Sequence, residues 1–117
     1  LRMANYLIQN SKFDEGISQL NQIIVDEKND ETIRDLALYF FILAQIDILD
    51  EDTFNSYLNE NKMKDGTFKF LFKELYGIKQ LLNMNTEAAK NIFTEIINNP
   101  EVPEEIFQRA SKYLTLI

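Results

Sequence analysis

The sequence contains no cysteine, no histidine and no tryptophan, and it has only 3 glycines and 2 prolines in 117 residues. Without cysteine the chain forms no disulfide and carries no thiolate, which fits a cytosolic and an exported protein equally. Without histidine it lacks the commonest general base and metal ligand. The three glycines, Gly16, Gly66 and Gly77, are too far apart to form a phosphate-binding loop. We therefore expect a protein that is not an enzyme and uses no cofactor.

An excess of basic residues and long apolar runs are also absent. The 12 Lys and Arg residues against 19 Asp and Glu residues give a formal net charge of -7. This charge argues against a nucleic-acid partner and against electrostatic contact with anionic lipid. No run of about 18 apolar residues is present, as a membrane-spanning helix would need. Because the chain begins at Leu1 already in helical pattern, we expect a fragment of a longer protein with an upstream N-terminal membrane anchor.

The residues that are abundant predict an ordered helical domain. Hydrophobic residues make up 45% of the chain, with 9 phenylalanines, which is typical of a globular fold rather than a disordered one. No segment alternates polar and apolar residues at period two, so strands are not expected. The length suits one domain with its own core. We predict a single all-α domain over residues 1–117.

The stretch 68–100 predicts two antiparallel helices joined by a tight turn. Apolar residues recur at helical spacing in both halves: Phe68, Leu71, Phe72, Leu75, Ile78 and Leu82 in the first, and Ala88, Ala89, Ile92, Phe93, Ile96 and Ile97 in the second. Gly77 lies inside the first stripe, where glycine costs about 1 kcal/mol relative to alanine. That cost is acceptable where a second helix approaches the backbone closely. Residues 83–86 form the predicted turn, with Thr86 as the N-cap.

Similar patterns predict helices along the rest of the chain. We expect helices over residues 1–10, 14–25, 31–49 and 103–117, and a short helix that contains Phe54, Tyr57 and Leu58. The polar stretch 26–30 predicts a connection that ends with Asp30 as an N-cap. Residues 59–66 are polar and are predicted to form a loop. Pro103 begins the last helix, where proline is tolerated.

The helical pairs align on one another and resemble the tetratricopeptide repeat. Ala4, Ala44 and Gly77 occupy equivalent positions about 33 to 40 residues apart, within the range of helix-pair repeats. The family pattern of small residue, turn, small residue and later aromatic matches Gly77, residues 84–86, Ala89 and Phe93, with Pro100 closing the repeat. The family's usual tryptophan and turn glycine are absent. The resemblance implies a right-handed superhelix of about three hairpins plus a C-terminal capping helix.

A narrower resemblance covers nearly the whole chain. The segments 74–77 (ELYG), 85–89 (NTEAA) and 100–103 (PEVP) are similar to those of a tetratricopeptide-like domain of alphaproteobacteria, the ancillary translocon subunit family and its uncharacterised rickettsial relatives. The resemblance implies a domain at the periplasmic face of the inner membrane, held by an anchor, that handles exported proteins or their chaperones. A cytoplasmic adaptor or homo-oligomerisation domain is the alternative.

The resemblance also implies a peptide-binding groove, because the first helix of each hairpin lines the concave face in this family. The residues carried over to that face are Asn5, Ile8, Gln9, Leu38, Phe41, Gln45, Ile48, Glu74, Ile78 and Leu81. Apolar residues with interspersed amides suit an extended or helical peptide. The alternative is that Leu38, Phe41 and Ile78 pack against neighbouring helices. Leucines stand at positions 1, 71 and 75, where chaperone-binding relatives carry a basic clamp, which disfavours acidic C-terminal peptides.

Two further features have simpler interpretations. Asp47, Asp50, Glu51 and Asp52 form an acidic cluster, but Phe54 stands where a calcium loop needs a third ligand, and no glycine follows. We interpret this cluster as a solvated helix end and predict no metal site. Homo-oligomerisation through the N-terminal edge, near Tyr6 and Leu7, is a further expectation.

Overall fold

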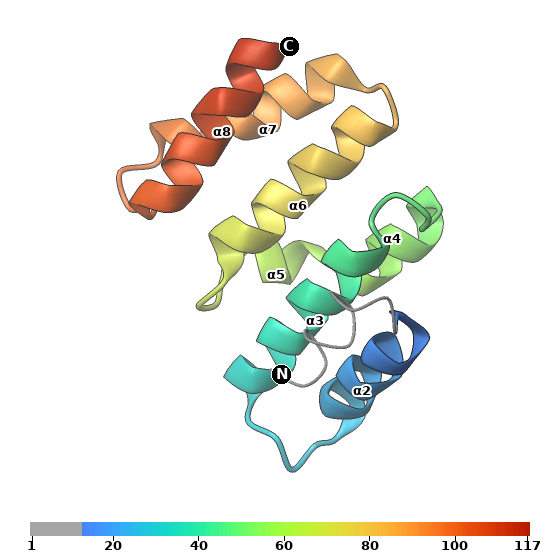
Figure 1. Cartoon of the computed structure of the whole chain (residues 1–117). Helices are drawn as coiled ribbons and strands as arrows, with labels where there is room; N and C mark the ends of the chain where they lie inside the picture. The colour runs from blue at the N-terminus through green and yellow to red at the C-terminus, as the bar shows by residue number, and fades with distance from the viewer. Residues whose placement is uncertain (1–12) are drawn as a thin grey trace. The chain divides into compact units, whose positions relative to one another are not determined.

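The computed structural model describes residues 13–117, and within this range it contains α-helices and no β-strand (Figure 1). The all-α prediction is confirmed for these residues. The helices are α2 (Phe13–Val25), α3 (Glu31–Gln45), α4 (Glu51–Tyr57), α5 (Glu60–Lys64), α6 (Lys69–Leu82), α7 (Thr86–Asn98) and α8 (Glu104–Leu116). The predicted helix over residues 1–10 lies outside the described range. The chain divides into two compact units, of which one ends at Tyr57 and the other is Leu58–Ile117. The single domain and the right-handed superhelix stay predictions.

The first unit contains the hairpin of α2 and α3. Asp30 is the N-cap of α3, as predicted, and its carboxylate accepts a hydrogen bond of 2.9 Å from the Ile33 amide. Polar side chains also satisfy the carbonyls at the end of α2, which lack partners within the helix. The Arg34 Nε donates to the Ile24 carbonyl at 2.8 Å, and the Asn29 side chain donates to the Ile23 carbonyl at 3.2 Å.

The acidic stretch 47–52 runs from just after the end of α3 into the first turn of the short α4. Helix α3 ends at Gln45, four residues before the predicted end at residue 49, and residues 46–48 form turns that are followed by a bend at residue 49. Asp50 accepts a 2.7 Å hydrogen bond from the Thr53 amide at the start of α4, and Glu51 and Asp52 occupy its first turn. These positions explain the acidic residues as helix-terminal groups, since carboxylates are favourable at helix N-termini.

The polar stretch 59–66 contains a helix that the sequence interpretation missed. Asn59 caps α5 by accepting a 3.2 Å hydrogen bond from the Lys62 amide, and Glu60 and Lys64 form an ion pair of 2.9 Å one turn apart. The predicted loop is therefore wrong over Glu60–Lys64. The helix has five residues and no buried residue, so it lacks the apolar periodicity from which helices are predicted.

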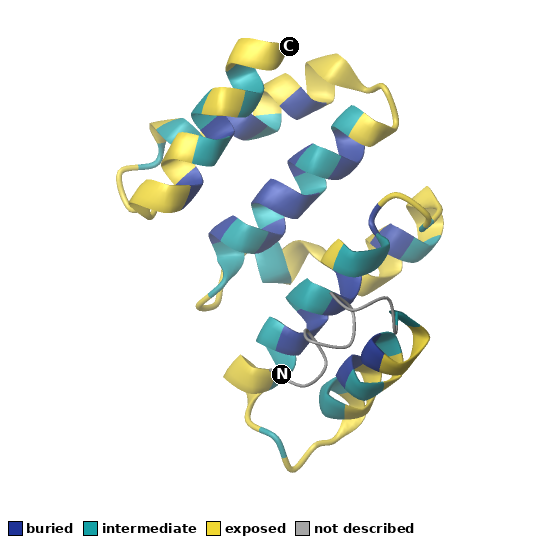
Figure 2. Ribbon diagram, viewed as in Figure 1, coloured by how far each residue is buried: buried dark blue, intermediate teal, exposed yellow. Residues whose placement is uncertain are grey.

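The second unit is built around the predicted hairpin of α6 and α7, against which α8 packs (Figure 1). Its core cluster comes from all three helices and consists of Phe70, Ala89, Phe93, Ile96, Ile106 and Ala110. Figure 2 shows closely spaced buried residues along α6 and fewer, more widely spaced ones on α7 and α8. The apolar stripes of both hairpin helices thus face a shared core, as their spacing predicts.

Gly77 is a point of close approach between α6 and α7. A Cβ atom at this position would lie 2.7 Å from Cε1 and 2.8 Å from Cζ of Phe93, and 3.3 Å from Cγ2 of Ile92. Phe93 is fully buried, so its ring has little space into which it can move. The expected close contact at Gly77 is confirmed, and the group that requires the glycine is the Phe93 ring.

The turn between α6 and α7 contains a residue in the left-handed region. Met84 has φ 63°, its amide donates to the Leu81 carbonyl at 3.0 Å, and the Asn85 amide donates to the Gln80 carbonyl at 2.8 Å. This pair of bonds is the Schellman motif, in which the left-handed position is usually glycine. The predicted capping by Thr86 is wrong because Thr86 is already the first residue of α7. The N-cap is Asn85, whose side chain donates to Gln80 Oε1 at 2.9 Å rather than capping the helix.

Met84→Gly is expected to stabilise the protein by about 0.5–1 kcal/mol. The left-handed conformation costs a residue with a Cβ about 1–2 kcal/mol, part of which is offset by the greater freedom of glycine in the unfolded chain. The Met84 side chain is 88% exposed, so little burial is lost. Urea unfolding measures the difference. The matched control is Asn83→Gly at the neighbouring position, where φ is -86° and glycine brings no relief. If both substitutions changed the free energy of unfolding equally, the predicted backbone strain at Met84 would be contradicted.

Candidate functional site

Two of the four described groove residues predicted in the first unit are buried. Leu38 and Phe41 on α3 are 8% and 6% exposed, and the Phe41 ring packs edge-on against Tyr57 at 5.2 Å. The Gln45 side chain donates to the Phe41 carbonyl at 3.0 Å, whereas Ile48, beyond the end of α3, is 69% exposed. The exposure expected for Leu38 and Phe41 is therefore wrong. Both side chains pack against neighbouring helices instead, which was the alternative interpretation. Asn5, Ile8 and Gln9 lie outside the described residues.

The predicted groove residues of the second unit line its interior. Ile78 and Leu81 are partly buried and pack against the core cluster. Glu74 is 2% exposed, which corrects the expected exposure, because its carboxylate is held by Arg109 of α8. The structure thus brings these three residues to the packed side of α6, while the predicted residues of α3 belong to the other unit. Peptide binding by the complete set stays a prediction.

The Glu74–Arg109 pair joins α6 to α8. The Arg109 Nε donates to Oε2 of Glu74 at 2.7 Å, and the Arg109 Nη2 donates to Oε1 at 2.9 Å. The side chain of Arg109 is 42% exposed, whereas that of Glu74 is 3% exposed. A two-bond contact between planar groups fixes both distance and orientation. The buried carboxylate is thus paired with a guanidinium whose outer part reaches solvent.

Tyr113 of α8 lies beside this pair, and its ring stacks on Phe93 with centroids 4.8 Å apart. Burial raises the pKa of the Tyr113 phenol above its usual value of about 10, and the negative charge of Glu74 raises it further, while Arg109 acts in the opposite direction. The folded state therefore favours the neutral phenol.

The raised pKa predicts a loss of stability at alkaline pH. A group whose pKa is higher in the folded than in the unfolded state stabilises the fold fully below its unfolded pKa, and this contribution is lost as pH rises through the folded pKa. We expect wild type to lose stability relative to Tyr113→Phe above about pH 10, with a constant difference below about pH 9. Urea unfolding across this range measures the difference. Parallel profiles at all pH values would exclude the effect.

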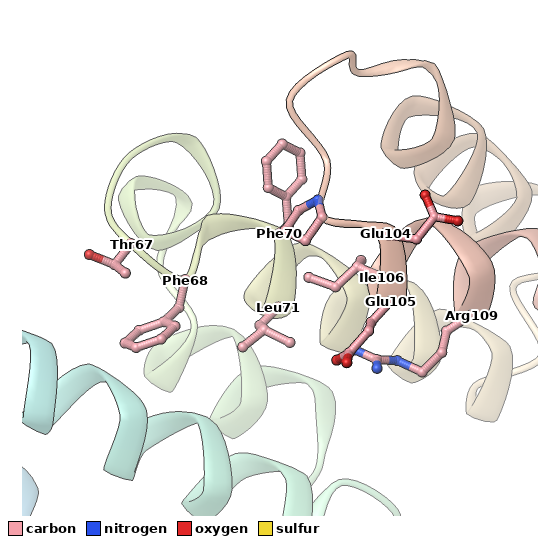
Figure 3. Close-up of a pocket in the computed structure, with 9 residues that line it drawn as sticks. Thr67, Phe68, Phe70, Leu71, Glu104, Glu105, Ile106 and Arg109 are labelled. Atoms are coloured by element: carbon pink, nitrogen blue, oxygen red, sulfur yellow. The ribbon is translucent and has the colours of Figure 1, made fainter.

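A cleft opens between the first turns of α6 and α8 (Figure 3). Its volume is about 340 Å³, and the residues that line it are Thr67, Phe68, Phe70, Leu71, Pro103, Glu104, Glu105, Ile106 and Arg109. Figure 3 shows the side chain of Ile106 pointing from α8 toward α6, and Leu71 of α6 also lines the cleft. Glu104 and Glu105 are exposed and leave the first turn of α8 in different directions. The cleft thus has an apolar floor and acidic edges.

The sequence interpretation missed this cleft. It identified Phe68, Leu71, Pro103 and Ile106 as helix residues, but its binding groove lay elsewhere. The two sides of the cleft are 35 positions apart, from Leu71 to Ile106, and no periodicity within one helix shows which end of α6 the start of α8 will meet. The available signal was the adjacent pair Glu104 and Glu105, placed directly before the apolar Ile106 at the beginning of a helix.

Two features are absent from the described residues. In residues 13–117 no three Asp, Glu, His or Cys side chains gather as metal ligands would. Over the same range no helix has the length and apolar character needed to cross a bilayer.

In comparisons with known proteins, no family model, no curated protein and no solved structure matches this chain.

Proposed function

We propose that this chain is a non-catalytic scaffold that binds short peptide segments of other proteins, built as a right-handed superhelix of tetratricopeptide-like hairpins. The observation that carries the proposal is the cleft between α6 and α8, which is open, apolar at its floor and charged at its edges. Peptide sites on helical scaffolds combine such features, since apolar pockets give affinity and edge charges give specificity. The absence of histidine and cysteine from the sequence supports a role without catalysis.

The hairpin of α6 and α7 supports the superhelical arrangement. The glycine at position 77, against which Phe93 packs, and the fully buried Ala89 are the positions at which the repeat pattern requires small residues. A helix pair of this kind buries its apolar faces against a further helix, and α8 provides that helix here. Solenoids built in this way leave surfaces on which peptides bind.

The peptide-binding proposal is tested with a positional-scanning library of acetylated octapeptides and the purified chain. Each library pool fixes one amino acid at one position and randomises the others. We expect saturable binding, measured by fluorescence anisotropy, that differs between pools. A chain that is folded by circular dichroism but binds every pool equally weakly would overturn the proposal.

For the cellular role, the resemblance to the ancillary translocon subunit family supports a periplasmic domain of a membrane-anchored protein that assists export or envelope assembly. A fusion of the complete natural protein to alkaline phosphatase, which is active only outside the cytoplasm, tests the location. Phosphatase activity supports the export role. An inactive fusion that is stably produced favours the alternative of a cytoplasmic adaptor or homo-oligomerisation domain, and light scattering then measures self-association.

A further inference from the structure

The cleft between α6 and α8 carries surplus negative charge at its edges. Of its lining residues, Arg109 is the cation, and its guanidinium is held by the buried Glu74. Lys69, next to the cleft residue Phe70, pairs with Glu101 at 3.5 Å and lies over the Phe70 ring at 5.2 Å from its centroid. Both cations are thus matched by carboxylates. Glu104 and Glu105 remain as the excess charge beside the apolar floor.

A second cleft in the same unit lacks this excess. It has a volume of about 290 Å³ and is lined by Glu60, Met63, Lys64, Lys73, Tyr76, Ile92 and Glu95. Its charged residues form two ion pairs, Lys64–Glu60 at 2.9 Å and Lys73–Glu95 at 3.0 Å. The charges at its rim balance, so electrostatics selects no sign of ligand there. The excess of negative charge therefore distinguishes the cleft between α6 and α8 from the second cleft.

We infer that the cleft between α6 and α8 binds a peptide segment in which a large apolar residue is flanked by lysine or arginine. This inference rests on the proposed peptide-binding function and names the ligand class. The apolar side chain enters between Leu71 and Ile106, where it is removed from water, and the basic side chains meet Glu104 and Glu105. A cleft of about 340 Å³ is at the small end of ligand sites, which fits one or two side chains.

The electrostatic part of the inference has a modest expected size. Glu104 and Glu105 are exposed, and pairs between exposed charges are weak and screened by salt. A second set of pools fixes two adjacent positions, a phenylalanine or leucine and its neighbour. We expect pools with lysine or arginine as the neighbour to bind roughly tenfold more tightly than pools with glutamate there, at low salt. This preference shrinks at high salt, whereas the requirement for the apolar residue persists.

The decisive experiment reverses the charge of the edge. The variant Glu104→Lys/Glu105→Lys is expected to prefer aspartate and glutamate pools over lysine and arginine pools, while it keeps the preference for the apolar residue. Misfolding cannot produce such a reversal, because it weakens all pools together. The matched control is Asp14→Lys/Glu15→Lys, which makes the same charge change in the first turn of α2. The control is expected to keep the wild-type preference.

The remaining outcomes separate this inference from the proposed function. Peptides that bind with no preference for basic residues, or whose amide shifts in ¹⁵N spectra fall outside residues 67–71 and 103–109, overturn the inference but leave peptide binding intact. Failure of every pool to bind overturns both. Concentration-dependent dimerisation that is abolished by the charge-reversed variant assigns the cleft to a second copy of the chain and also overturns the inference.

Discussion

Arg109→Met is expected to lower the free energy of unfolding by about 3 kcal/mol, because it leaves the carboxylate of Glu74 buried without its cation. Glu74 is 2% exposed, and both of its carboxylate oxygens accept bonds from Arg109. Removing one member of a buried pair typically costs about 3–5 kcal/mol. We take the lower end because Arg109 is itself 42% exposed, so water lies near the pair.

The opposite substitution is expected to cost less. Glu74→Met leaves Arg109 without its carboxylate, but the guanidinium already reaches solvent and can be hydrated there, so we expect a loss of about 1 kcal/mol. The double variant Glu74→Met/Arg109→Met is expected to lie within about 1 kcal/mol of wild type, since an apolar pair of similar size replaces a buried ion pair at little cost. Arg109→Met is thus expected to lower the free energy of unfolding most among the three variants, because Glu74 is buried more deeply than Arg109.

Native-state hydrogen exchange of the amides in α6 and α8 measures these differences within the second unit. The control is Lys73→Met, which removes a 3.0 Å ion pair with Glu95 that also connects two helices but whose partners are 30% and 63% exposed. We expect this change to cost at most about 1 kcal/mol. If Arg109→Met cost no more than Lys73→Met, the Glu74–Arg109 pair would not be a buried structural contact.

Gly77→Ala is expected to destabilise the protein by about 1 kcal/mol although alanine is the better helix former. The new methyl group would lie 2.7 Å from the Phe93 ring, and a fully buried ring cannot move away without disturbing its neighbours. Overpacking of this kind costs about 1–3 kcal/mol, against a gain of about 1 kcal/mol in helix propensity. The effect on stability therefore has the opposite sign from the effect in an isolated helix.

A second variant shows whether the ring is the cause. Phe93→Leu shortens the side chain that the new methyl group would meet, and it lowers stability by itself because it leaves a cavity. In this background Gly77→Ala is expected to be neutral or stabilising. The coupling between the two sites, obtained from urea unfolding of all four proteins, is expected to be about 2 kcal/mol. Additive effects would mean that the ring does not force position 77 to be glycine.

The sequence predicted the elements that bury a regular apolar stripe. Helices α6 and α7, and the contact at Gly77, follow from periodicity and from the cost of glycine within a helix. Helix α5 was missed because its stability depends on Asn59 and on an ion pair at its surface rather than on a buried face. The left-handed Met84 was also missed, because the motif normally has glycine there and the sequence offers none in that turn.

The candidate site was harder to predict because it depends on packing between distant helices. Glu74 was placed on an exposed face by analogy with repeats, whereas the structure pairs it with a residue 35 positions later. A carboxylate in a helical stripe does not reveal whether a cation will meet it. In the same way, the first turns of α6 and α8 form a cleft only because α8 packs back along the hairpin.

The two-bond contact between Glu74 and Arg109 has a consequence for how α8 aligns along α6. Apolar side chains such as Ile106 and Ala110 tolerate sliding, because the ridges of one helix can fit the next groove of another. A slip of one helical turn would separate the carboxylate and the guanidinium by about 5.4 Å and break both bonds. Neighbouring registers are thereby disfavoured, and the first turn of α8 stays opposite the first turn of α6.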